Sequence, residues 1–129
     1  MPGKAQAVTS GEALQNAVVQ VGRELELEVK TQVRVGKRIW GAERRIDVVL
    51  THPDTRQSIG LECKFQGGPG SAEEKIPTTI QDIKAWPIRG IVVFDGQGFS
   101  AHMRSYLYST GMAVELEDLT VWLQLFFGL

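Results

Sequence analysis

Three ionisable side chains stand in two apolar segments of this 129-residue chain. Asp47 interrupts the apolar run at 46–50, and Glu62 and Lys64 follow fifteen and seventeen residues later, in the apolar run at 59–65. A charged group in a segment that is otherwise buried is costly unless it meets a partner or a metal ion. These three residues are therefore the first candidates for chemistry in the sequence.

The chemistry that two acids and a lysine could perform follows from their charges. Two carboxylates that face each other repel, and without a counter-ion one of them would hold its proton. A divalent cation resolves that conflict, and Mg²⁺ prefers carboxylate and carbonyl oxygens. A lysine beside the ion could orient or deprotonate a water and offset charge as a phosphodiester is attacked. The combination suits the hydrolysis of phosphate esters.

A β-hairpin is the element predicted to position these groups. The connecting stretch 51–57 contains a proline and an aspartate, which are typical of turns between strands. Symmetry about Asp54 and Thr55 places Asp47 opposite Glu62.

In this register, side chains sort cleanly onto two faces. Lys64 and Gln66 share a face with Glu62 and Asp47, since side chains at i and i+2 point the same way along a strand. A one-residue slip would mix polar and apolar residues on each face. The apolar face then contains Ile46, Val48, Leu50, Ile59, Leu61 and Cys63.

The pattern resembles the signature of the PD-(D/E)XK nuclease superfamily, in which an acid at the end of one strand is followed by Glu-x-Lys on the next. The match is Asp47 with Glu62-Cys63-Lys64, and Ile46 replaces the usual proline before the first acid. Gln66 extends the match to an ExKxQ variant that is similar to the one in some restriction enzymes and junction-cleaving nucleases. The resemblance implies an α/β (α+β) fold with a restriction-endonuclease-like αβββαβ core and a central mixed sheet flanked by helices.

The resemblance also implies roles for single residues. Asp47 and Glu62 would bind the metal through their side chains and Cys63 through its backbone carbonyl, while Lys64 would attend the nucleophilic water. The cofactor would be Mg²⁺, with Mn²⁺ able to substitute. A further acid on the first helix often completes such a site, and Glu12 is the best candidate. The competing acids are Glu24, Glu26 and Glu28.

Each assignment has a structural alternative. The acids and Lys64 could form an ion-pair cluster on a solvated sheet face. Glu12 could be a first-turn acid favoured by the helix dipole. Gln66 could cap a strand end, and the Cys63 thiol is best explained as a small buried hydrophobic group.

The pattern along the chain predicts one domain spanning 1–129, with 1–9 as a loose arm and no internal repeats. Ser10 is a predicted N-cap, and Gly36-Lys37 a predicted turn between the first two strands. Predicted helices cover 11–24, 71–85, 100–108 and a terminal segment capped by Glu117 or Asp118; predicted strands cover 26–35, 38–51, 58–66, 90–94 and 112–116.

Basic residues gather immediately before Asp47, although the net charge of −1 counts against a nucleic-acid partner. On the first two strands they could hold a phosphate backbone beside the scissile bond, and Lys75 could add a contact. The alternative is a solvated hairpin surface. The basic residues of this stretch are Lys30, Arg34, Lys37, Arg38, Arg44 and Arg45.

The C-terminal segment carries more apolar residues than one helix face needs, which favours a two-fold homodimer, with closure of the monomer core as the alternative. One cysteine and no Cys/His spacing exclude an intrachain disulfide and argue against a zinc site. No signal peptide and no apolar run near the ~20 residues of a membrane helix are present, so we expect a cytoplasmic, DNA-associated protein. The surplus apolar residues are Leu119, Trp122, Leu123, Phe126 and Phe127.

Together these features predict a Mg²⁺-dependent DNA endonuclease acting on duplex or branched DNA. Restriction-like or homing-type cutting and cleavage of junctions or repair intermediates both fit the residues. A catalytically silent nucleic-acid-binding subunit and an RNA nuclease remain as alternatives.

Overall fold

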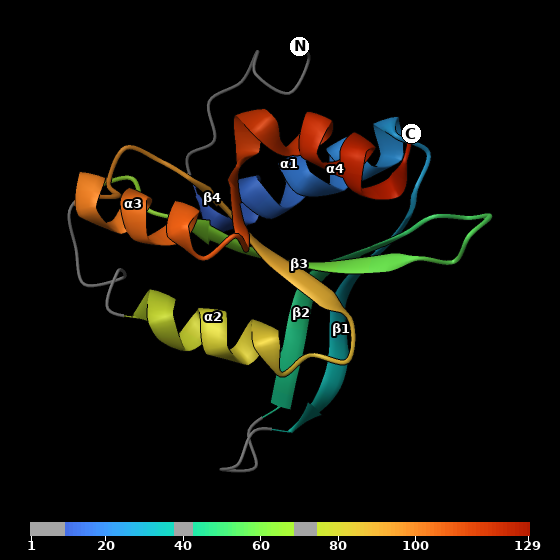
Figure 1. Cartoon of the computed structure of the whole chain (residues 1–129), viewed down its shortest axis with the longest axis horizontal. Helices are drawn as coiled ribbons and strands as arrows, with labels where there is room; N and C mark the ends of the chain where they lie inside the picture. The colour runs from blue at the N-terminus through green and yellow to red at the C-terminus, as the bar shows by residue number, and fades with distance from the viewer. Residues whose placement is uncertain (1–9, 38–42, 69–74) are drawn as a thin grey trace.

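The computed structural model describes residues 10–37, 43–68 and 75–129. In this part of the chain, five strands form one sheet in the order β1-β2-β3-β4-β5 (Figure 1). The first three strands pair antiparallel, and β3, β4 and β5 pair parallel. The strands are β1 (Glu28–Lys37), β2 (Glu43–Thr51), β3 (Ser58–Phe65), β4 (Arg89–Asp95) and β5 (Ala113–Glu115).

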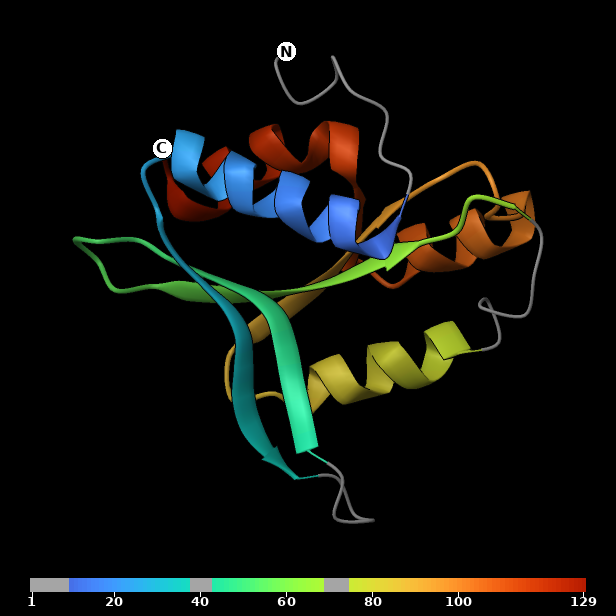
Figure 2. The ribbon, with the colours of Figure 1, turned by 180° about the vertical axis from the view of Figure 1, so that it is seen from behind.

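Helices cover both faces of this mixed sheet, which confirms the predicted α+β architecture. Helices α1 and α4 lie side by side on one face, and α2 and α3 lie on the other (Figures 1 and 2). None of the described helices is both long and apolar enough to cross a membrane. The helices are α1 (Gly11–Glu24), α2 (Ile76–Lys84), α3 (Ala101–Ser109) and α4 (Leu119–Phe127), with a 3₁₀ turn, η3 (Leu116–Asp118), before α4.

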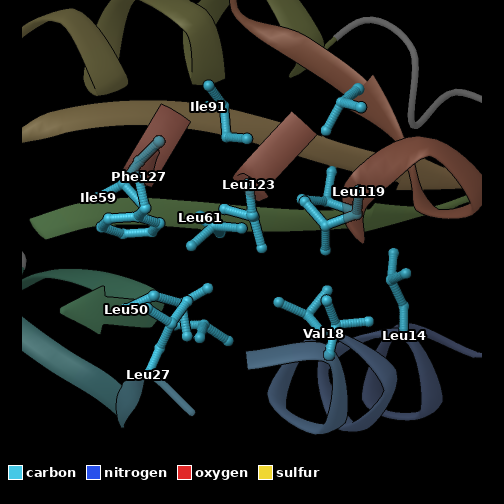
Figure 3. Packing of buried hydrophobic residues seen from close by; sticks show 14 residues of the cluster. Leu14, Val18, Leu27, Leu50, Ile59, Leu61, Ile91, Leu119, Leu123 and Phe127 are labelled. Atoms are coloured by element: carbon cyan, nitrogen blue, oxygen red, sulfur yellow. The ribbon is translucent and has the colours of Figure 1, made fainter. Parts of the chain in front are cut away.

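Strand β4 separates two apolar clusters, which explains its unbroken apolar sequence. Ile91 and Val93 belong to the cluster between the sheet and helices α1 and α4, whereas Val92 and Phe94 belong to the cluster between the sheet and helices α2 and α3. We call these the upper and lower clusters. The labelled side chains of the upper cluster come from α1, β2, β3, β4 and α4 and from Leu27 before β1 (Figure 3).

Helix α1 has the predicted bounds because its sequence carries both a cap and an apolar stripe. The Ser10 hydroxyl accepts a hydrogen bond from the Ala13 backbone N–H at 3.0 Å. Leu14 and Val18 are fully buried on the face toward the sheet. The helix therefore begins and ends where its local signals place it.

The first hairpin differs from the prediction. Gly36 and Lys37 belong to β1 and pair with Arg44 and Glu43, so the predicted turn at these two residues is wrong. The pairing register shifts between Arg34 and Gly36, and the φ of Gly36 is +123°. The glycine therefore serves an irregularity within the strand, where its freedom at positive φ is needed. The connection to β2 lies outside the described residues.

Helix α2 is observed from Ile76 rather than from the predicted residue 71, and the predicted cap Ser71 lies outside the described residues. Pro77 lies in the first turn, where its missing N–H costs no hydrogen bond. At α3 the predicted start is confirmed, because the Ser100 hydroxyl accepts from the Met103 N–H at 3.0 Å.

The C-terminal helix α4 contributes to the monomer core, as one of the two alternatives predicts. Its residues Leu119, Leu123 and Phe127 are buried in the upper cluster. The opposite side remains apolar as well: Val121, Leu125 and Leu129 are 58%, 79% and 51% exposed.

Candidate active site

The candidate site lies where β2 and β3 separate. Their ladder runs from Thr51–Ser58 to Val48–Leu61, in the register that the sequence predicts. β2 pairs with β1 on both sides of Val48, and β3 pairs with β4 on both sides of Leu61, so each strand keeps its other neighbour beyond the end of this ladder. The strands therefore part at Asp47 and Glu62, and the bend of β2 away from β3 is visible in Figure 1. We call this place the fork.

Strand β2 also changes face at the fork, which corrects one expectation. Val48 belongs to the upper cluster and Ile46 to the lower cluster, although strict alternation would put both on one face. The distortion coincides with an irregularity in β1, where Gln32 has a φ of +51°. The β1–β2 pairing continues on both sides of that point, at Thr31–Val48 and at Val33–Ile46. The predicted placement of Ile46 on the same face as Val48 is therefore wrong.

Asp47 spans the gap that the separating strands leave. Its Oδ2 accepts a hydrogen bond from the Cys63 backbone N–H at 2.9 Å, and its Oδ1 accepts one from Gln32 Nε2 at 3.3 Å. The Asp47 side chain thus takes the place of a backbone carbonyl that would continue the ladder. An ionised carboxylate offers about four lone-pair sites, so two remain for other ligands.

Glu62 lies beside Asp47 in an unfavourable environment. Burial, and secondarily the charge of Asp47, raise the pKa of Glu62 from 4.5 to about 7, while the charge of Lys64 acts in the opposite direction. In the described part of the chain, Glu62 Oε1 is buried and has no hydrogen-bond partner. Lys64 Nζ lies 3.7 Å from Glu62 Oε2. The fork therefore holds two adjacent acids and a lysine, with insufficient positive charge for both acids.

This donor set fits a hard divalent cation. The Asp47 and Glu62 carboxylates, from neighbouring strands, are close enough to interact, and the buried Glu62 Oε1 has no donor among the described residues. Among the described residues, no group of three or more His, Cys, Asp and Glu side chains is assembled. Mg²⁺ is commonly held by one or two carboxylates and keeps several waters, so two side chains suffice. The Cys63 backbone carbonyl between Glu62 and Lys64 remains the predicted third protein ligand.

The Cys63 thiol is unsuited to chemistry of its own. Burial raises its pKa, and the negative charges of Asp47 and Glu62 raise it further. Its side chain packs against the upper cluster. A thiol that resists ionisation is a poor nucleophile, which agrees with its interpretation as a small apolar residue.

Glu12 does not join the two acids at the fork. It is exposed in the first turn of α1. The residue through which α1 reaches Asp47 is Gln15, whose Oε1 accepts from Gln32 Nε2 at 3.1 Å. Sequence reasoning missed both glutamines. For Gln32 the one available signal was its position opposite Asp47 in the first hairpin.

The three competing acids lie elsewhere. Glu24 is an exposed residue in the last turn of α1, and Glu26 lies in the connection to β1 with a φ of +61°. Glu28 forms an ion pair with Arg56 at 2.5 Å.

Gln66 joins two loops. Its Nε2 donates to the Gly98 carbonyl at 2.8 Å, and its backbone carbonyl accepts from the Gly98 N–H at 2.7 Å. A Cβ on Gly98 would lie 2.3 Å from the Gly68 carbonyl oxygen, so the loops after β3 and β4 pack backbone to backbone. Gln66 Oε1 is buried without a partner among the described residues. These contacts hold the chain beyond Lys64, and a catalytic role for Gln66 stays a prediction.

The basic residues of the β1–β2 hairpin divide into two groups. Arg34 and Arg45 are cross-strand neighbours and both are exposed. Arg44 is directed toward α2, with its Nη2 3.9 Å from Asp82 Oδ1 and its Nε buried. Lys75 is exposed at the start of α2. Arg38 and the side chain of Lys37 lie outside what the structure describes.

Comparison with known proteins identifies the family. A family model described as a PD-(D/E)XK nuclease superfamily domain matches residues 5–121. The chain belongs to this superfamily. PD-(D/E)XK nucleases generally use divalent metals, which agrees with the paired acids at the fork. None of the curated proteins is significantly similar to the chain in sequence.

Two solved structures have a fold similar to that of this chain. One is AF1548, a protein of unknown function; it is 21% identical, with a TM-score of 0.52 over 78% of this chain and 54% of the other. The second is the protein VC1899 from Vibrio cholerae; it is 12% identical, with a TM-score of 0.55 over 85% of this chain and 31% of the other. At these identities the likeness shows the fold alone. The chain spans about half of the first relative and a third of the second.

Proposed function

We propose that this chain is a Mg²⁺-dependent endonuclease that hydrolyses phosphodiester bonds in DNA. The observation that carries the proposal is the convergence of Asp47 and Glu62 at the fork, with Lys64 Nζ 3.7 Å from Glu62. Membership of a nuclease superfamily supports the reaction class. Mn²⁺ would substitute for Mg²⁺, because it takes the same oxygen ligands.

The residues of the fork would divide the work. Asp47, Glu62 and the Cys63 carbonyl would hold the ion. When bound, Mg²⁺ would polarise the phosphate group and make a nearby water more acidic. The Lys64 ammonium would orient that water and offset the negative charge that accumulates on the phosphate oxygens during attack. Glu62 must be ionised for this arrangement, and the cation would favour its ionised form.

The β1–β2 hairpin would hold the substrate backbone. Arg34 and Arg45 are exposed on adjacent strands that extend from the fork, so their side chains would contact phosphates near the scissile bond. Lys75, at the start of α2, and Lys37 and Arg38 stay predicted phosphate contacts. Arg44, which is directed toward Asp82, would contribute to the shape of the hairpin more than to phosphate binding. Affinity should fall steeply with salt.

A two-fold dimer through α4 would complete the enzyme. Val121 and Leu125, four residues apart on α4, are exposed on the same side of the helix, and Leu129, just beyond the end of the helix, is exposed as well. A second copy is the partner that such an apolar surface fits best, and two copies would place two sites on one DNA. Analytical ultracentrifugation should give a dimer for the native chain and a monomer for Leu125→Glu. A monomeric native chain would refute the dimer.

Cleavage of a substrate panel tests the proposal. The protein is incubated with plasmid, linear duplex, a four-way junction and RNA, in Mg²⁺, Mn²⁺ or EDTA, beside Lys64→Ala and the matched control Lys84→Ala at an exposed lysine of α2. We expect metal-dependent cleavage of DNA by the native chain and the Lys84 variant only. The preferred DNA distinguishes site-directed cutting of duplexes from cleavage of branched intermediates.

Three outcomes would contradict the proposal. Equal cleavage by Lys64→Ala would remove Lys64 from the reaction. DNA binding without cleavage would indicate a silent binding subunit. Cleavage of RNA alone would replace DNA as the substrate.

A further inference from the structure

Gln32 has a strained backbone in the middle of a strand. Its φ of +51° lies in the left-handed region, which residues other than glycine rarely adopt. The neighbours on both sides, Thr31 and Val33, pair normally with β2. Such a conformation persists only when its surroundings enforce it, and strained residues gather at functional sites.

The Gln32 side chain connects three elements. Its Nε2 lies 3.1 Å from Gln15 Oε1 on α1 and 3.3 Å from Asp47 Oδ1 on β2. Asp47 Oδ2 in turn accepts the Cys63 N–H of β3. An amide nitrogen has two hydrogens, so Gln32 donates to both acceptors at once. A continuous set of hydrogen bonds therefore runs from α1 through Gln32 and Asp47 to the fork.

Burial does not explain this arrangement. Gln32 is exposed, so water could satisfy its amide in any rotamer. The strained backbone instead places the amide between Gln15 and Asp47. The chain thus adopts an unfavourable backbone conformation at Gln32, whose side chain contacts Asp47.

We propose that Gln32 is a positioning residue that holds the Asp47 carboxylate in the fork, with Gln15 fixing the Gln32 amide. The consequence for cation binding and cleavage rests on the proposed function; the consequence for Asp47 itself does not. A neutral amide orients a carboxylate without neutralising it, whereas a lysine or arginine would compete with a cation for the same oxygens. The Asp47 carboxylate therefore stays available to an ion while its rotamer is fixed.

Hydrogen exchange at the Cys63 amide reports the position of Asp47 without metal or substrate. We expect Gln32→Ala to speed exchange of this amide about tenfold, toward the rate in Asp47→Ala, which removes the acceptor. The amide of Val93, in the neighbouring strand β4, serves as the internal reference and should keep its rate. An unchanged Cys63 rate in Gln32→Ala would overturn the proposal.

Gln32→Gly separates the side chain from the backbone. Glycine adopts positive φ without strain, so this variant keeps the fold of β1 and removes only the amide. We expect the same loss of Cys63 protection as in Gln32→Ala, and a smaller loss in Gln15→Ala. Native exchange in Gln32→Gly would show that backbone shape alone holds Asp47, and the proposal would fail.

Calorimetric titration with Mn²⁺ distinguishes this inference from the proposed function. We expect Gln32→Ala and Gln32→Gly to weaken Mn²⁺ binding about 10- to 100-fold, as the loss of partners of metal ligands typically does, with Lys84→Ala unchanged. A native chain that binds no Mn²⁺ but shows the predicted exchange would refute the proposed function and leave the positioning role. Native Mn²⁺ affinity in both Gln32 variants would refute the positioning role in cation binding and leave the proposed function.

Discussion

The two halves of the β2–β3 hairpin differ although they belong to the same two strands. From Thr51–Ser58 to Val48–Leu61 the strands pair regularly, and Leu50 and Ile59 are fully buried. At the fork the pairing ends, a carboxylate accepts the next backbone N–H, and Glu62 retains a buried oxygen without a partner among the described residues. We call these the paired half and the fork half.

This difference indicates how one small fold separates stability from chemistry. Buried backbone groups in the paired half are satisfied by the sheet, so its fully buried side chains can be apolar. In the fork half β2 and β3 no longer satisfy each other's backbone groups, and burial together with the charge of Asp47 raises the pKa of Glu62. A bound cation would relieve the repulsion between the two acids, so we expect the fork half to trade stability for function.

The largest expected effect is on cleavage, from Asp47→Asn. Removing the charge of one acid should lower kcat on the order of a thousandfold, equivalent to about 4 kcal/mol of barrier, because the cation loses a charged ligand. Single-turnover cleavage in Mg²⁺ measures it. The same substitution at the exposed turn residue, Asp54→Asn, should leave kcat unchanged. Equal kcat in the two variants would break the assignment of chemistry to the fork half.

In the paired half we expect a large loss of stability instead. Leu61→Ala removes a fully buried side chain from the upper cluster and should lower the free energy of unfolding by about 2–5 kcal/mol. Urea unfolding gives this value, and Lys84→Ala, at an exposed residue of α2, is the control. The rate of cleavage per folded molecule should be unchanged in Leu61→Ala. A loss of cleavage in molecules that remain folded would mean that the paired half also contributes to the chemistry.

Glu62→Gln should stabilise the metal-free protein. Because folding raises the pKa of Glu62 from 4.5 to about 7, the folded state holds a proton that the unfolded state releases, and stability falls as pH rises between these values. The full loss amounts to about 3–4 kcal/mol, since one pKa unit corresponds to about 1.4 kcal/mol. Urea unfolding in EDTA at pH 5 and pH 8 should show this fall in the native chain and a flatter response in Glu62→Gln. If the free energy of unfolding of the native chain rose from pH 5 to pH 8 relative to that of Glu62→Gln, the burial of Glu62 would be contradicted.

The smallest expected effect concerns the far end of the hairpin. Arg56 and Glu28 form an ion pair with side chains 62% and 46% exposed. Exposed pairs contribute little, so Arg56→Ala should change the free energy of unfolding by less than about 1 kcal/mol and leave kcat unchanged. A loss as large as that of Leu61→Ala would mean that the turn, and not the buried face, holds the paired half together.

Residues with strong local signals were predictable from the sequence. Asp47, Glu62 and Lys64 stood out because charges in apolar segments need a reason, and alternation fixed the register that the structure shows from Val48–Leu61 onward. Ser10 and the apolar stripe behind it gave the bounds of α1.

The remaining features depend on tertiary structure. The strands separate, and Ile46 changes face, next to the residue with a positive φ, Gln32. No sequence pattern predicts that backbone conformation. A glycine suits a turn and a strand irregularity equally, so Gly36 was misplaced. Gln15 carries no charge and so gave no signal, whereas the acid three residues earlier, Glu12, did.

A crystal structure with Mn²⁺, located by its anomalous signal, tests the central claim most directly. We predict one ion at the fork, about 2.2 Å from a carboxylate oxygen of Asp47 and from one of Glu62, with the Cys63 carbonyl beside it. Soaked crystals of Asp47→Asn should lose the signal. An ion bound elsewhere, or no ion between these two carboxylates at saturating Mn²⁺, would contradict the account.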